Sequence, residues 1–288
     1  MKMKKFLVQP GKKVSLKDFD SNYTGKHVDH ESAKDKLARD IEKLANLQDK
    51  LYADDRCGIL MIFQAMDAAG KDGTIKHVMS GINPAGCEVY SFKAPSSAEL
   101  DHDFLWRTSR SLPQRGRIGI FNRSYYEEVL TVRVHPEFLE KEKLPDGAIS
   151  KKIWDERYKD INSFEKYLSR NGYVMLKFFL HISKQEQKKR FLARIEDATK
   201  NWKISRSDMT ERARWGDYMK SFEDLLAATS TKHAPWYIIP ANHKWFAHLA
   251  VADIIVQTLE GLNLQYPKVT KEQRALLAEM KRALARER

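Results

Sequence analysis

Residues 65–74 read Ala-Met-Asp-Ala-Ala-Gly-Lys-Asp-Gly-Thr, and the segments on either side of them decide the fold. The preceding residues 57–63 form a continuous apolar run, which is typical of a strand buried on both faces of a parallel sheet. Residues 74–80 return to the apolar spacing of a helix. Gly70 and Lys71 are therefore predicted at a helix N-terminus, where unpaired backbone N–H groups and the helix dipole favour anions.

The same stretch departs twice from the strict P-loop pattern, which is Gly, four residues, and then Gly-Lys-Ser/Thr. Ala65 replaces the first glycine and Asp72 replaces the hydroxyl residue. Without a hydroxyl beside Lys71, a magnesium ion must find other oxygen ligands, and Asp67, Asp72 and Thr74 are the local candidates. An ordinary strand-to-helix turn with a surface lysine is the alternative interpretation.

The composition describes a globular, highly charged chain, because 42% of the 288 residues are apolar and 31% are charged. No apolar run approaches the ~20 residues of a membrane helix, and the basic N-terminus has no long apolar segment behind it. We therefore expect a cytoplasmic protein without membrane contact. Cys57 and Cys87 match no metal-ligand or redox spacing, so we expect two buried thiols.

The formal net charge of +12 should attract polyanions, which include nucleic acid, acidic lipids and inorganic phosphate chains. A solvated basic surface without a specific ligand is the alternative. A basic helix expected at 270–286 adds the hypothesis of a nucleic-acid-binding protein. The sequence carries no RNP-type aromatic pattern, zinc finger or basic zipper, so no specific nucleic acid is expected.

The predicted elements alternate between strands and helices, which is the order of a parallel sheet. Strands are expected at 57–63, 88–92, 118–121, 174–182 and 236–239. Helices are expected at 33–52, 74–80, 97–109, 149–170, 244–259 and 270–286, with a charged helical region at 184–226. We predict a single domain over 1–288 with an α/β fold, a three-layer α/β/α sandwich, in which 1–29 form an N-terminal arm and 183–228 a helical lid.

Polar side chains follow the third predicted strand at the sheet edge where open α/β folds bind ligands. Asn122 is a neutral oxygen donor where P-loop enzymes usually carry an aspartate, so Asp67 is expected to take more of the metal binding. Arg123 could stabilise charge on a transferring phosphoryl group, and Glu127 could orient a metal-bound water or the acceptor. A structural ion pair of Arg123 with Glu127 or Glu128 is the alternative.

A cation-rich run occupies residues 184–214, directly after the fourth predicted strand. Arg190 and Arg194 are four residues apart and share a helix face. In this position the segment could close over residues 65–74 and exclude water, although a solvated helix face explains many such runs. The sequence offers no histidine pair with metal-ligand spacing and no Ser-His-Asp arrangement.

These segments together resemble the family-2 polyphosphate kinases over most of the chain. The resemblance rests on residues 67–73 as a Walker A motif, 102–107, 121–130 as a Walker B motif, and 202–203, 214–215, 218 and 234–241 as lid and closing strand. It implies a P-loop kinase fold similar to thymidylate kinases, with a helical lid. It also implies reversible, Mg²⁺-dependent transfer of the terminal phosphoryl group between inorganic polyphosphate and a nucleotide, with Mn²⁺ as an alternative metal.

The resemblance also implies roles for single residues. Asp67 would hold Mg²⁺ and orient the acceptor phosphate. Lys71 would neutralise the transferring phosphoryl group, and Arg123 would stabilise its charge. The motif Asn-Arg-Ser-x-Tyr-Glu, which ends at Glu127, resembles that of the subgroup that phosphorylates both AMP and ADP. The expected phosphate- and substrate-binding residues are Ala68, Ala69, Gly70, Asp72, Gly73, Thr74, Asn122, Arg133, Arg194 and Lys203, and the expected metal ligands are Asp67 and Asn122. A dimer or tetramer is favoured. An ATP-dependent nucleotide or small-molecule kinase is the alternative.

Overall fold

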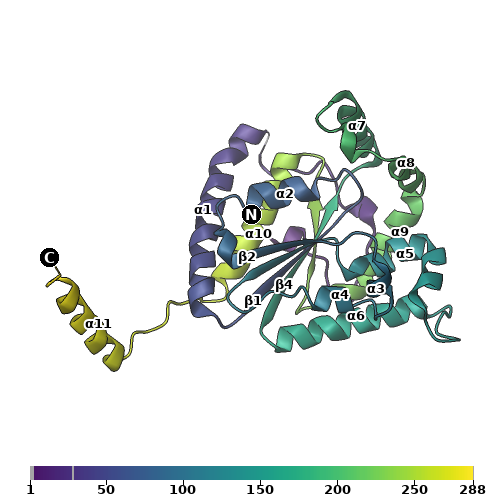
Figure 1. Cartoon of the computed structure of the whole chain (residues 1–288). Coiled ribbons are helices and arrows are strands. Elements are labelled where there is room, and N and C mark those ends of the chain that lie inside the picture. Colours follow the sequence, from purple (N-terminus) through teal and green to yellow (C-terminus); the bar gives the residue numbers. More distant parts are fainter. Residues whose placement is uncertain (1–2, 28, 288) are drawn as a thin grey trace.

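The computed structural model describes residues 3–27 and 29–287. Five strands form one sheet in the order β2-β3-β1-β4-β5, and all neighbouring strands are parallel (Figure 1). The strands are β1 (Gly58–Gln64), β2 (Cys87–Ser91), β3 (Ile118–Asn122), β4 (Tyr173–His181) and β5 (Trp236–Pro240). The predicted parallel α/β fold is confirmed, and each strand lies within one residue of its expected bounds.

β1 lies at the centre of the sheet, and all 7 of its residues are buried. It pairs with β3 on one side and with β4 on the other. Because helices also cover both faces of the sheet, side chains on either side of β1 meet apolar partners. This is why residues 58–63 are continuously apolar rather than alternating.

Helices form a layer on each face of the sheet (Figure 1). α1 (His30–Asp54), α2 (Lys71–Val78) and α10 (Lys244–Glu260) share one hydrophobic core with the sheet, and α6 (Ile153–Arg170) and α9 (Trp215–Thr229) share the other. α10 is apolar on nearly all sides because it packs against both α1 and the sheet. The predicted three-layer sandwich is confirmed. None of the helices in the described residues has the length and apolar character needed to cross a membrane.

The expected helix over 97–109 is wrong, because the chain forms two short helices there. A capping box between Ser96 and Glu99 starts α3, and Asp103 then accepts a hydrogen bond from the Leu105 N–H (2.9 Å) and starts a separate turn. The remaining helices are α3 (Ser97–Leu100), α4 (Trp106–Ser109), α5 (Thr131–Val134), α7 (Lys184–Glu196), α8 (Arg206–Ala213) and α11 (Lys271–Leu284). The 3-10 helices are η1 (Met3–Lys5), η2 (Leu16–Asp18), η3 (Pro84–Gly86), η4 (Tyr125–Val129), η5 (Pro136–Glu142) and η6 (Asn201–Lys203).

The N-terminal arm packs along β5, a strand at the edge of the sheet. The Val8 N–H donates to the Trp236 carbonyl (2.9 Å), and the Ile238 N–H donates to the Phe6 carbonyl (2.8 Å). Phe6 and Val8 are buried. The arm therefore covers backbone groups that an edge strand would otherwise expose. Residues 1, 2 and 28 of the predicted arm lie outside the described residues.

The two cysteines are unpaired and half-buried, so the expectation of two buried thiols is wrong. Cys57 precedes β1, and Cys87 is the first residue of β2 at the edge of the sheet. Neither position is enclosed on all sides. Burial of its inner side still raises the pKa of the Cys87 thiol to about 11.

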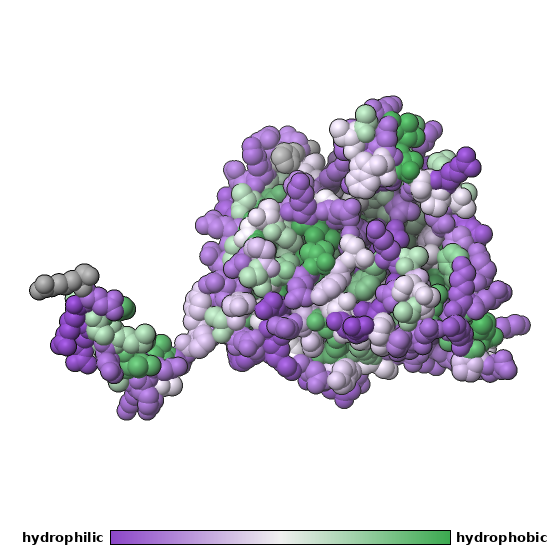
Figure 2. All heavy atoms as spheres, viewed as in Figure 1, coloured by the Kyte–Doolittle hydropathy of each residue, from purple (hydrophilic) through white to green (hydrophobic). Residues whose placement is uncertain are grey.

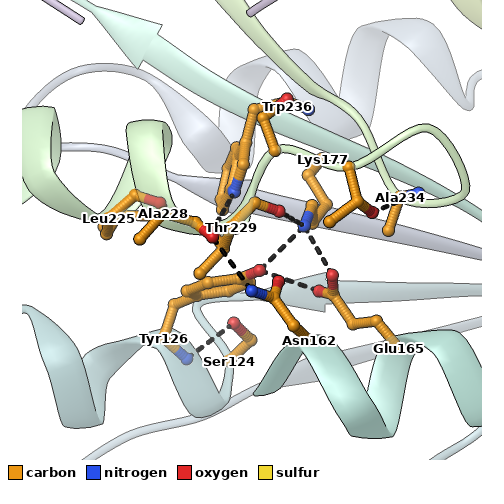
Figure 3. Close-up of polar contacts among 12 residues, drawn as sticks. Ser124, Tyr126, Asn162, Glu165, Lys177, Leu225, Ala228, Thr229, Ala234 and Trp236 are labelled. Atoms are coloured by element: carbon orange, nitrogen blue, oxygen red, sulfur yellow. Dashed lines mark hydrogen bonds and ion pairs between the residues drawn. The ribbon is translucent and has the colours of Figure 1, made fainter. Parts of the chain in front are cut away.

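A buried ion pair links β4 to α6 (Figure 3). Lys177 and Glu165 are both 0% exposed, and the Lys177 Nζ lies 2.6 Å from Glu165 Oε2. The same ammonium donates to the Tyr126 hydroxyl (2.8 Å) and to the Thr229 carbonyl (2.8 Å). Glu165 Oε1 accepts from the hydroxyls of Tyr125 and Tyr126, each at 2.8 Å. Burial lowers the pKa of Lys177 to about 8, and the Glu165 carboxylate opposes that shift.

Replacing Lys177 with Met should lower the free energy of unfolding by about 3–5 kcal/mol, because Glu165 would keep a buried carboxylate without its cation. Urea unfolding measured by tryptophan fluorescence tests this, with the buried Trp236 of the same network as a reporter. Lys166→Met, an exposed position on α6, is the control and should stay within about 0.5 kcal/mol of the wild type. Equal losses of unfolding free energy in the two variants would show that the Lys177–Glu165 pair contributes no more to stability than an exposed lysine does.

Candidate active site

The phosphate turn, residues 65–74, connects β1 to α2. Gly70 is the N-cap residue of α2 with a φ of 101°, a left-handed conformation that favours glycine, and Lys71 is the first helical residue. A hydrogen bond from the Ala69 N–H to the Met66 carbonyl (3.3 Å) closes the turn. The predicted position of Gly70 and Lys71 at a helix N-terminus is confirmed. The first N–H groups of α2 have no intrahelical acceptor and can bind an anion.

Lys71 is buried at the start of α2, and its ammonium donates to the Ala65 carbonyl (3.1 Å). Burial lowers the pKa of Lys71, and the nearby Arg123 guanidinium lowers it further, while carboxylates at the site act in the opposite direction. Two cations thus lie near each other, of which Lys71 is buried and Arg123 is partly exposed. An anion bound between them would relieve their repulsion.

Arg123 directly follows β3 and contacts the phosphate turn. Its Nη2 lies 3.0 Å from Asp67 Oδ1, and its backbone φ of 64° is unusual for a residue other than glycine. The carboxylates of Glu127 and Asp67 raise the pKa of Arg123. The alternative of an ion pair with Glu127 or Glu128 is wrong, because Asp67 is the contacted carboxylate and Glu128 pairs with Arg157.

The ends of β1 and β3 meet at one edge of the sheet, because Phe63 lies opposite Asn122 in the parallel register. Asn122 donates from Nδ2 to Asp72 Oδ1 (2.7 Å). Glu127, in η4, accepts a hydrogen bond from the Thr131 hydroxyl (2.6 Å). The structure therefore gathers the residues predicted to be catalytic, which are Asp67, Lys71, Arg123 and Glu127.

The oxygen atoms at this edge suit a hard divalent cation that also binds phosphate. Asp67 and Asp72 carry carboxylates, and Asn122 carries an amide oxygen. Mg²⁺ typically uses one or two protein oxygens together with water and substrate phosphate oxygens. In the part of the chain that the structure describes, no group of three or more His, Cys, Asp or Glu side chains could hold a metal by itself. A metal here would therefore take its other ligands from the Asn122 amide oxygen, from water or from substrate phosphate oxygens.

A pocket of about 220 Å³ opens beside Arg123, next to the carboxyl ends of β2 and β3. One part of its wall is apolar and another part is charged. It is lined by Phe92, Ala94, Pro95, Leu100, Val132 and Phe138, by Lys93, Arg107, Arg123 and Lys141, and by Glu127, Glu128, Thr131 and Glu142. Aromatic and aliphatic walls beside fixed charges suit a flat base that carries an anionic group. Sequence reasoning found only Arg123 and Glu127 of this wall.

Glu128 and Glu142 share one guanidinium at the wall of this pocket. Arg157 is buried, lies 3.4 Å from Glu128 Oε2 and also binds Glu142 Oε2. Within the described residues, Glu142 Oε1 has no hydrogen-bond partner. Burial and the Glu142 carboxylate raise the pKa of Glu128 to about 7. The folded protein therefore holds a proton on Glu128 up to a higher pH than an ordinary carboxyl group would.

Glu128→Gln should change how stability depends on pH. The folded-state pKa of about 7 lies above the ordinary value of 4.5, so the folded protein binds this proton more tightly than the unfolded chain. Stability contributed by this group is fully present below pH 4.5 and is lost as the pH rises through 7, a loss of about 3 kcal/mol. The variant lacks this loss, so its unfolding free energy relative to the wild type should rise over the same range.

Urea unfolding at about pH 4.5 and above pH 7 measures the difference. Glu140→Gln removes an exposed carboxylate of the same segment, η5, and serves as the control. The raised pKa of Glu128 would be refuted if the unfolding free energies of the two variants changed equally with pH, relative to the wild type.

Three of the predicted phosphate-binding cations do not contact the phosphate turn anywhere in residues 3–27 and 29–287. Arg133, on α5, donates to the Tyr158 hydroxyl (2.6 Å) and to Asp224 (2.7 Å), so its guanidinium already has protein partners. Arg194, in the last turn of α7, and Lys203, in η6, each lie over an aromatic ring of their own segment.

Two side chains that sequence reasoning did not assign to the site do contact the phosphate turn. Gln187 donates to the Asp67 carbonyl (3.0 Å), and Arg190 donates to the carbonyls of Ala68 (3.1 Å) and Ala69 (2.7 Å). A cation in a basic helix has the same sequence pattern whether it faces solvent or protein. The burial of Arg190, which is 7% exposed, is visible only in the folded chain.

The segment expected as a lid, 183–228, divides into three parts. The first turns of α7 contact the phosphate turn, and Phe222 and Leu225 of α9 pack into the core on one face of the sheet. Between them, η6 and α8 contain no buried residue, and Trp202 is 77% exposed. This middle part therefore contributes less to the hydrophobic cores than α7 and α9 do.

Phosphoryl transfer is the chemistry that this edge of the sheet serves, because it gathers main-chain N–H groups, a lysine and an arginine beside carboxylates without any nucleophilic triad. The fold and the phosphate turn place the chain among the P-loop kinases. The family model described as polyphosphate kinase 2 (PPK2) matches residues 27–267. This chain belongs to the polyphosphate kinase 2 family.

Similar proteins match the chain over nearly its whole length. An ADP-polyphosphate phosphotransferase of Rhodopseudomonas palustris is 50% identical, with 99% of each chain covered. An AMP/ADP-polyphosphate phosphotransferase of Meiothermus ruber is 42% identical, over 92% of this chain and 96% of its own. The crystal structure of polyphosphate kinase 2 from Arthrobacter aurescens superimposes with a TM-score of 0.84 and 40% identity, covering 94% of this chain and 95% of that one.

Proposed function

We propose that this polyphosphate kinase transfers the terminal phosphoryl group of inorganic polyphosphate to ADP and AMP, giving ATP and ADP, and that the reaction is reversible. The contact between Arg123 and Asp67 carries the proposal, because it joins the phosphate turn, which follows β1, to the pocket at the ends of β2 and β3. The similar proteins from R. palustris and M. ruber bear names that state the same classes of substrate.

The phosphate turn is assigned as the binding site of the phosphoryl donor, inorganic polyphosphate. Lys71 and the first N–H groups of α2 are the groups suited to a phosphoryl group that carries negative charge. Phosphoryl transfer passes through a loose transition state, so positioned cations matter more than acid-base groups. The backbone of the turn would complete the cradle through Ala68, Ala69, Gly70, Asp72, Gly73 and Thr74.

The acceptor nucleotide is assigned to the pocket beside Arg123. Phe92 and Phe138 offer aromatic surface to the base, and Arg123 lies where the acceptor phosphate would meet the donor. Arg123 would stabilise charge on the transferring group, and Glu127 would orient the acceptor. The donor and acceptor sites then meet at Asp67, the residue that Arg123 contacts.

Mg²⁺ is the proposed metal, with Mn²⁺ as an alternative, and Asp67 and Asn122 are its proposed ligands. When bound, it would neutralise charge on the phosphate oxygens of both substrates. Asp67 Oδ1 contacts Arg123, and the Nδ2 atom of Asn122 donates to Asp72, so Asp67 Oδ2 and Asn122 Oδ1 are the oxygens proposed for the metal. The more distant phosphates of the polyphosphate donor are assigned to Arg194 and Lys203. Arg133 is the remaining proposed substrate-binding cation.

We also propose a homo-oligomer, either a dimer or a tetramer. α11 extends away from the rest of the protein, and apolar side chains gather along it (Figures 1 and 2). Leu276, Leu277, Met280 and Leu284 are all at least half exposed there. A second copy would cover such a face. The two unpaired cysteines fit a reducing compartment such as the cytoplasm, where we place the reaction.

Purified protein incubated with Mg²⁺, polyphosphate and either AMP or ADP should form ADP or ATP. Chromatography of the nucleotides measures the products, and the reverse reaction is followed from ATP. Reactions with ATP as the only phosphoryl donor test the alternative of an ATP-dependent kinase. The proposal fails if neither nucleotide is phosphorylated by polyphosphate.

Lys71→Ala and Arg123→Ala should each lower kcat by about 10²–10³-fold or more, because both cations act mainly on charge that develops in the transition state. Circular dichroism and thermal unfolding establish that each variant is folded. Lys76→Ala removes an exposed cation from the same helix, α2, and should keep kcat within about twofold. Rates near the wild type in both site variants would refute the assigned roles.

A further inference from the structure

Three consecutive carbonyl groups of the phosphate turn accept hydrogen bonds from one helix, α7. Gln187 Nε2 donates to the Asp67 carbonyl at 3.0 Å. Arg190 Nη1 donates to the carbonyls of Ala68 and Ala69 at 3.1 Å and 2.7 Å. Gln187 and Arg190 are both buried. The conformation of the turn therefore depends on side chains from a distant part of the chain.

Arg190 has no N–H group left for a phosphate. Its Nε donates to Glu186 (2.8 Å), and its Nη2 donates to the carbonyls of Ala241 (2.5 Å) and Asn242 (3.0 Å) between β5 and α10. Together with the two bonds from Nη1, these contacts use all five donors of a guanidinium. Arg190 therefore acts on the backbone of the protein and not directly on the substrate.

Holding these carbonyls fixes the direction of the neighbouring amides. In a planar trans peptide, the carbonyl of one residue and the N–H of the next point in opposite directions. Carbonyls of Asp67 and Ala69 that point at α7 therefore turn the N–H groups of Ala68 and Gly70 away from it. These amides, followed by the first N–H groups of α2, form a row of donors of the kind that binds phosphate.

The turn needs such support because its backbone is strained. Ala68 has a φ of 61°, a left-handed conformation that is unfavourable for a residue with a Cβ. Such conformations persist where surrounding contacts determine them. Arg190 supplies these contacts from the outer side of the turn, and a Cβ added at Gly70 would lie 3.6 Å from its Nη1.

We propose that Gln187 and Arg190 are positioning residues that hold the phosphate turn in its anion-binding conformation, so that affinity for the phosphate donor depends on α7. This inference rests on the assignment of the turn as the donor site. It also makes the first turns of α7 a fixed wall of the site.

The test compares Arg190→Met with Lys189→Met, which removes the same charge from an exposed neighbouring position on α7. Calorimetric titration of each full-length protein with inorganic tripolyphosphate, without nucleotide, measures donor affinity. Arg190→Met should weaken binding by about tenfold or more, since charged donors to buried carbonyls are lost. Lys189→Met should stay within about twofold. Arg190→Lys should give an intermediate affinity because an ammonium can still donate to part of the set.

Steady-state kinetics separate positioning from general damage. Arg190→Met should raise KM for polyphosphate and lower kcat, while KM for ADP stays within about twofold of the wild type. Gln187→Met loses the donor to the Asp67 carbonyl and the acceptor for Arg212, and it should weaken tripolyphosphate binding by about three- to tenfold. It decides the question if Arg190→Met does not fold. The inference is overturned if folded Arg190→Met, or Gln187→Met in its place, binds tripolyphosphate as Lys189→Met does. If Lys71→Ala also binds it normally, the donor-site assignment itself has failed.

Discussion

Because β1 and β3 pair in parallel, with Phe63 opposite Asn122, both strands end at the same edge of the sheet. The chain leaves β1 into the phosphate turn and leaves β3 into the segment that carries Arg123. Asp67 and Arg123 therefore lie 3.0 Å apart although 56 positions separate them in sequence. Every group assigned to phosphoryl transfer depends on this register, since a slip of one residue would turn the side chains at the end of β3 to the opposite face.

The electrostatics of the site follow from that gathering. Lys71 and Arg123 lie close enough for the guanidinium to lower the pKa of Lys71, and carboxylates around them offset part of the repulsion. In the proposed reaction, a phosphate group would bind between these two cations. The site is thus organised before a substrate arrives. In phosphoryl transfer, such preorganised charge supplies most of the stabilisation of the loose transition state.

Support for the site comes from two sides of the sheet edge. On one side, α7 contacts the carbonyls of the phosphate turn through Gln187 and Arg190. On the other, the Lys177–Glu165 pair binds the hydroxyls of Tyr125 and Tyr126, which lie in sequence between Arg123 and Glu127 (Figure 3). Lys177 and Glu165 are completely buried and Arg190 is 7% exposed, so both sets of contacts would be costly to open.

The sequence by itself determined the strands, the parallel sheet and the phosphate turn, because each depends on local pattern: apolar runs, a left-handed glycine and a lysine at the start of a helix. It also singled out Asp67, Lys71 and Arg123 by their place after strands. Only the tertiary structure decided which partners these side chains meet. Arg123 contacts Asp67 instead of Glu127, Arg133 is committed to Asp224, and Arg190 faces the turn rather than solvent. A basic helix or an Arg-Glu spacing has the same sequence pattern in either case, because burial and hydrogen-bond partners come from segments far apart in the chain.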